Sequence, residues 1–93
     1  MAEFIHQHSA VVDGEDGARY RARVYAARRR DGTWNAWIEF VPADGSASAI
    51  ELRTDQETSQ PDRRAVEYWA GGLEHVYLEG ALRRALGRVS AGR

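Results

Sequence analysis

Apolar and polar residues alternate along four stretches of the chain, at residues 4–12, 18–29, 33–42 and 47–54. Turns that contain Asp-Gly separate them, at residues 13–17, 30–32 and 43–46. Alternation with a period of two, broken by such turns, is typical of antiparallel strands that follow one another in a sheet. We therefore expect a four-stranded antiparallel meander with the strand order 1-2-3-4.

The turn between the second and third stretches allows the register of that hairpin to be predicted. A two-residue loop would place Val24 opposite Glu39 and mix apolar with charged positions on each face. A three-residue loop at residues 30–32, with Gly32 left-handed in a bulge, keeps the faces separate. The predicted cross-strand pairs are then Val24–Ile38, Ala22–Phe40, Arg23–Glu39 and Tyr25–Trp37. One face becomes apolar, and the other carries an ion pair beside an aromatic pair.

Residues 61–89 have helical spacing instead, after a polar loop. Pro61 suits a first helical turn, and Ser59 or Gln60 is the expected N-cap. On a helical wheel the apolar residues form two stripes that lie more than a right angle apart. The first stripe contains Val66, Trp69, Ala70, Leu73, Tyr77 and Ala81, and the second contains Leu78, Leu82, Ala85, Leu86 and Val89. One straight helix cannot bury both stripes against one sheet.

The adjacent glycines Gly71 and Gly72 leave two solutions open. They can end a first helix and reorient a second, because glycine accepts left-handed dihedral angles. Alternatively, one bent helix continues, and its second stripe projects from the sheet. We favour the continuous helix, because neither proline nor a turn cluster follows the glycines. The predicted fold is thus α+β, a four-stranded antiparallel meander with a long or bent C-terminal helix packed on one face.

Composition sets the size and class of the molecule. The 93 residues are expected to form one domain, residues 1–93. All 13 basic side chains are arginine, accompanied by 15 alanines and 9 glycines, a bias typical of a GC-rich bacterial genome. The arginine count alone therefore does not indicate nucleic-acid binding. The net charge is −1, no stretch is apolar enough to span a membrane, and the N-terminus does not resemble a secretory signal, so we expect a cytoplasmic protein.

The charged face of the predicted sheet is the first candidate site. It brings together Arg21, Arg23, Tyr25 and Trp37, with Glu39, Glu51 and Arg53 beside them. Aromatic residues between arginines resemble the platforms on which RNA-binding sheets stack bases. The glutamates and the balanced net charge argue against that use. A solvated, ion-paired face is favoured over a nucleic-acid platform. The preferred functional interpretation is a protein-contact face centred on Tyr25 and Trp37, since exposed aromatic residues and arginine are favoured at contacts.

Histidines and carboxylates provide weaker candidates for chemistry. His6 and His8 lie on one side of a strand, and His75 and Glu79 lie one helical turn apart. A metal site needs three or four converging ligands, which neither pair supplies alone. The chain has no cysteine, and neither a phosphate-binding loop nor a paired-carboxylate motif accompanies His75. We therefore expect no catalytic residue, no metal and no cofactor, and an enzyme acting on a small ligand ranks third.

The leading hypothesis is a small non-enzymatic protein that acts through protein association. The stripe that contains Leu78, Leu82 and Leu86 would project from the continuous helix and need a partner, which predicts a homodimer. The alternative is a nucleic-acid-binding module that uses the arginines and aromatic residues of the open sheet face, together with the Arg28 to Arg30 corner at the hairpin end.

Overall fold

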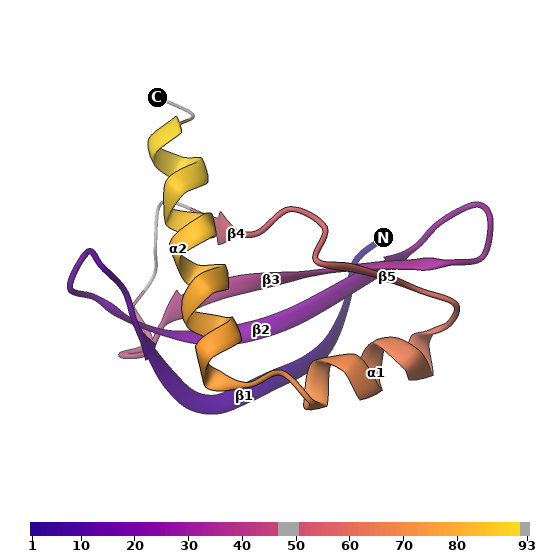
Figure 1. Ribbon diagram of the computed structural model, residues 1–93, viewed down its shortest axis with the longest axis horizontal. Coiled ribbons are helices and arrows are strands. Elements are labelled where there is room, and N and C mark those ends of the chain that lie inside the picture. Colours follow the sequence, from indigo (N-terminus) through magenta and orange to yellow (C-terminus); the bar gives the residue numbers. More distant parts are fainter. Residues whose placement is uncertain (47–50, 92–93) are drawn as a thin grey trace.

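The computed structural model describes residues 1–46 and 51–91, which form an antiparallel sheet with two helices on one of its faces (Figure 1). The strands are β1 (Glu3–Asp13), β2 (Arg19–Arg28), β3 (Trp34–Pro42), β4 (Leu52–Arg53) and β5 (Thr58–Gln60). The helices are α1 (Arg63–Gly71) and α2 (His75–Ala91). The order β1-β2-β3-β4 confirms the predicted meander, and the α+β class is also confirmed.

The hairpin between β2 and β3 has the predicted register. Val24 lies opposite Ile38 and Tyr25 opposite Trp37. Gly32 has a φ of 90°, and its N–H donates to the carbonyl of Arg29 at 3.0 Å, which closes the three-residue loop. Positive φ is accessible to glycine because it lacks a Cβ atom.

The ion pair predicted on this hairpin is not formed, although Arg23 does lie opposite Glu39. The Nε of Arg23 donates to Oε1 of Gln7 at 2.8 Å. Glu39 instead accepts a hydrogen bond from the indole N–H of Trp37 at 3.0 Å. Both side chains thus find a neutral partner within reach, and the register alone did not reveal these competing partners.

The sheet differs from the prediction along the far edge of β3. The predicted strand at residues 47–54 is represented by the short β4, and residues 47–50 lie outside the described residues. The loop that follows contains β5, which also pairs with β3. Between them, Thr54 exchanges hydrogen bonds with Ile38, and the N–H of Glu57 donates to the carbonyl of Ala36. Backbone pairing needs no apolar pattern, so this polar segment gave no strand signal.

The C-terminal region contains two helices in place of the favoured continuous one. Asp62 is the N-cap of α1, rather than Ser59 or Gln60, and its Oδ1 accepts from the N–H of Ala65 at 2.8 Å. The helix ends at the glycine pair, where the N–H of Gly72 donates to the carbonyl of Tyr68 at 3.3 Å. The break turns α2 out of line with α1 (Figure 1). Residues of both apolar stripes therefore pack into one core.

The core lies between the sheet and the two helices, and it includes the second stripe. Leu78 is 2% exposed, Leu82 is 1% exposed, and Leu86 is partly buried against the same cluster. These leucines were predicted to form a dimer interface on a projecting helix. That prediction is wrong for Leu78 and Leu82, because the sheet of their own chain covers them. The expected homodimer loses this basis.

Candidate functional site

The open face of the sheet carries a row of aromatic rings that runs across β1, β2 and β3. The ring of Phe4 meets that of Tyr25 edge-on at 5.7 Å between centroids. Tyr25 stacks on Trp37 at 6.5 Å with 16° between the ring planes. The guanidinium carbon of Arg53 then lies 4.3 Å from the centroid of the Trp37 ring, a cation–π contact.

Most polar groups on this face already have partners within the chain. Nη1 of Arg21 donates to the carbonyl of Ser9 at 2.7 Å, and Arg23 is bound to Gln7. Trp37 is only 8% exposed, whereas Phe4, at the end of the row, is 50% exposed. The structure thus brings the predicted site residues Tyr25, Trp37, Arg21 and Arg23 together on one face. A ligand could stack on the Trp37 ring only if Arg53 moved aside.

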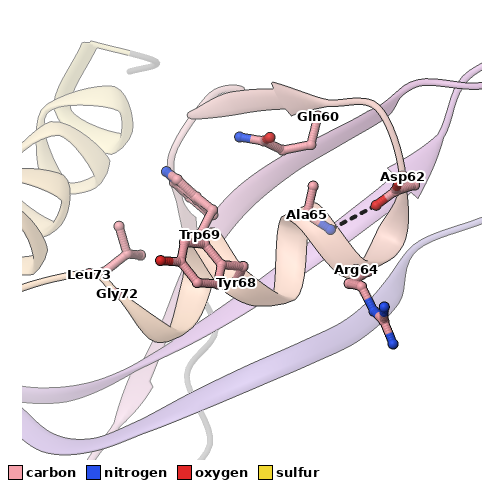
Figure 2. A pocket seen from close by; sticks show the side chains of 8 residues that line it. All are labelled: Gln60, Asp62, Arg64, Ala65, Tyr68, Trp69, Gly72 and Leu73. Carbon is pink, nitrogen blue, oxygen red and sulfur yellow. Dashed lines mark hydrogen bonds between the residues drawn. The ribbon is translucent and has the colours of Figure 1, made fainter.

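A groove on the helical side of the molecule is the second candidate. It lies between β5 and α1 and has a volume of about 750 Å³ (Figure 2). Its lining residues come from the end of β5, from α1 and from the α1–α2 junction. They are Gln60, Asp62, Arg64, Ala65, Tyr68, Trp69, Gly72 and Leu73. We call this opening the α1–β5 groove.

The aromatic residues of the α1–β5 groove differ in how firmly they are held. Tyr68 is 87% exposed, so its ring is almost free of contacts with its own chain. Trp69 and Leu73 are partly buried and pack against the core. The Trp69 ring also meets that of Tyr77 edge-on at 6.5 Å. The groove therefore combines a fixed apolar floor with a projecting tyrosine.

A carboxylate in the segment before β5 supports this floor through Tyr77 of α2. The side chain of Glu57 is 8% exposed, and its Oε1 accepts from the Tyr77 hydroxyl and from Nη2 of Arg84, both at 2.5 Å. Burial, followed by the bond to Glu57, raises the pKa of Tyr77 to about 12. These contacts fix Tyr77 under Trp69 and join the segment before β5 to α2.

The histidines do not assemble a site. The rings of His6 and His8 meet edge-on at 4.7 Å, and His75 lies 3.8 Å from Glu79 on the exposed side of α2. Nε2 of His8 is buried without a hydrogen-bond partner among the described residues. Burial, with a smaller effect of His6, lowers the pKa of His8, against the opposing effect of the Ala70 carbonyl. Within the described part of the chain, no three histidine, aspartate or glutamate side chains are grouped to hold a metal ion.

Comparisons with known protein families, with curated proteins and with solved structures returned no match. Within the described residues, no helix has the length and apolar character that crossing a membrane requires.

Sequence reasoning missed the α1–β5 groove, although one signal for it was present. Trp69 and Leu73 were assigned to the first apolar stripe, which is correct, and both line the groove as well. Tyr68 lies on the side of the second stripe and stands three residues before the glycine pair. A large aromatic residue on that side, before a break that redirects the helix, is a reason to look for a contact surface.

Proposed function

We propose that this protein is a non-enzymatic binding module that associates with another protein through the α1–β5 groove. The observation that carries the proposal is the exposure of Tyr68, 87%, over a groove of about 750 Å³ with an apolar floor. Tyrosine and tryptophan are favoured at the centres of protein contacts, because they bury a large area at little cost in side-chain entropy.

The stability of the fold does not explain why a tyrosine stands exposed at position 68. A side chain that remains exposed in the folded state gains little of the roughly 1.5–3 kcal/mol that full burial of a large apolar side chain provides. A partner that covered the ring would gain this contribution on binding instead. Trp69 and Leu73, held from behind by Tyr77 and the core, offer that partner a preformed surface.

The test uses a display library of random linear peptides, selected on the intact protein. We expect related sequences to be enriched on the wild-type protein and to bind Tyr68→Ala at least about tenfold more weakly, as for the loss of a central aromatic contact. Phe4→Ala is the matched control, because Phe4 is an exposed aromatic residue on the opposite face. Its affinity for the selected peptides should not change.

The proposal is overturned if selection yields no related sequences, or if the selected peptides bind Tyr68→Ala as tightly as they bind the wild type. Circular dichroism of both variants checks the fold, which the exposed positions of the two rings leave intact.

The open sheet face supports a second candidate, a protein contact at Phe4 and Tyr25 with Arg21 and Arg23 beside them. The row of three aromatic rings favours it. Peptides whose affinity falls in Tyr25→Ala and not in Tyr68→Ala would favour this face over the groove. Binding of a labelled single-stranded oligonucleotide that weakens steeply with salt and fails in Tyr25→Ala would indicate nucleic acid instead.

A further inference from the structure

Gln60, which lines the α1–β5 groove, is the last residue of a strand with a free edge. β5 pairs with β3 on one side, and among the described residues no strand pairs with its other side. An edge strand leaves alternate backbone N–H and C=O groups without a partner strand, which makes it a template for another extended chain. α1 follows directly after Pro61 and Asp62, so the helix provides the facing wall (Figure 2).

β1, the edge strand on the opposite side of the sheet, is less suited to such pairing. Two register shifts interrupt it, between Phe4 and His6 and between Gln7 and Val11. The carbonyl of Phe4 accepts from Nη2 of Arg63 at 3.3 Å. Bulges and charged side chains are devices that protect an edge from added strands.

One end of the groove is cationic. Gln60, the last residue of β5, lies opposite Trp34, which lies opposite Arg28 on the next strand. The tip of the β2–β3 hairpin, with the exposed run Arg28 to Arg30, therefore stands at the Gln60 end of the groove. Arg64 lines the groove where α1 begins (Figure 2).

The acidic side chains near this end are already engaged. Oδ1 of Asp31 accepts from the N–H and the hydroxyl of Thr33, at 2.9 and 2.6 Å. Asp62 caps α1 through Ala65. Glu3 and Glu67 both bind Arg63. Among the residues that the structure describes, Arg28, Arg30 and Arg64 make no ion pair.

We propose that the α1–β5 groove takes an extended segment of a partner protein that adds a strand to the free edge of β5. Every second side chain of that segment is apolar and packs on Tyr68, Trp69 and Leu73. The end beside Gln60 is acidic and meets Arg28, Arg30 and Arg64. In this mode the backbone hydrogen bonds supply affinity, and alternate side chains supply specificity. The inference rests on the proposed function and specifies its partner.

The β5 strand of a second copy of this chain does not have the features required of the partner segment. It has the sequence Thr-Ser-Gln, which offers neither apolar side chains for the groove nor carboxylates for the arginines. A dimer measured by light scattering, and converted to a monomer by Tyr68→Glu, would therefore contradict the inference.

The test measures fluorescence anisotropy with a synthetic peptide of alternating valine and threonine that ends in a run of glutamate. Two further peptides carry backbone N-methyl groups, one on the valines and the other on the threonines. Because alternate N–H groups of a strand point to opposite sides, only one set can face β5. We expect one methylated peptide to bind at least about tenfold more weakly than the parent and the other to bind within about twofold.

The charge pattern has its own control. Replacing the glutamates of the peptide by glutamine, or Arg28, Arg30 and Arg64 together by glutamine, should weaken binding by about three- to tenfold and reduce its salt dependence. The two changes combined should weaken binding little further, because they remove the same contacts.

The outcomes separate the inference from the proposed function. If both methylated peptides bind like the parent, or the parent does not bind while display-selected peptides bind through Tyr68, the strand addition is wrong and the proposed function stands. If neither the designed nor the selected peptides bind through the groove, both proposals fall.

Discussion

At the scale of single residues, exposure and not residue type separates structural from candidate binding positions. Leu82 was predicted at an interface and is 1% exposed in the core, whereas Tyr68, on the same side of the helical wheel, is 87% exposed. Periodicity correctly placed the leucines and the aromatic residues on faces of a helix. It could not say which face the sheet would cover, because that depends on the direction of α2.

Leu82→Ala tests the assignment of the second stripe to the core. We expect it to lower the free energy of unfolding by about 2–5 kcal/mol, because a fully buried leucine leaves a cavity when truncated. Urea denaturation measures the loss, and Val76→Ala, at a residue that is 69% exposed on the same helix, is the control. A Leu82→Ala variant as stable as this control would contradict the burial.

Tyr20 and Tyr77 predict how stability depends on alkaline pH. Burial, followed by bonds to Asp16 and Glu57 respectively, raises both pKa values from 10.0 to about 12. Because the folded state holds these protons more tightly than the unfolded state, their contribution is complete below pH 10 and is lost as the pH rises towards 12. Denaturation across this range, with Tyr77→Phe for comparison, measures the effect. Stability that stays constant to pH 12 in the wild type would contradict it.

At the scale of elements, the hairpin was predictable and the helix break was not. Only one register of β2 on β3 separates an apolar face from a charged one, so the sequence of this pair determines its geometry. For β5, the pairing is made by the backbone of a polar segment, and side-chain pattern carries no signal. Residues of three segments form the α1–β5 groove. It could therefore not be predicted before the positions of β5 and of the helix break were known.

The break at the glycine pair follows from packing. Burial of Leu78 and Leu82 is worth roughly 1.5–3 kcal/mol each. The few helical hydrogen bonds lost at the junction are worth about 0.5–1.5 kcal/mol each and are partly replaced, as the N–H of Gly72 still bonds to the carbonyl of Tyr68. The two glycines lower the stability of a continuous helix by a further 1 kcal/mol or so each. Burying both stripes is therefore favoured over continuity.

A pair of glycine substitutions tests this explanation. Gly72 has a φ of −92°, and an added Cβ atom would meet the nearest atom, the Tyr68 carbonyl oxygen, at 3.6 Å. Gly72→Ala should therefore be neutral or stabilise the fold by up to about 1 kcal/mol. Gly32, with a φ of 90°, requires a left-handed conformation, so Gly32→Ala should destabilise by about 1–2 kcal/mol. Urea denaturation compares them, and the reverse order of stability would contradict the account.

At the scale of the whole molecule, the two faces of the sheet differ in what they leave unsatisfied. The open face holds its arginines and Trp37 in contacts within the chain. The helical side leaves Tyr68 and the edge of β5 uncovered by the described residues. Arg28, Arg30 and Arg64 are exposed beside them. A partner that supplies apolar side chains, a backbone and carboxylates would satisfy all of these at once.

The most direct test of this account is an NMR titration of the labelled protein with the valine, threonine and glutamate peptide. We expect the backbone amide signals that shift to belong to residues 57–73 and to the hairpin at residues 28–33, while those around Phe4 and Trp37 stay in place. Shifts centred on the open sheet face, or no shifts at all, would contradict the assignment of the α1–β5 groove as the contact surface.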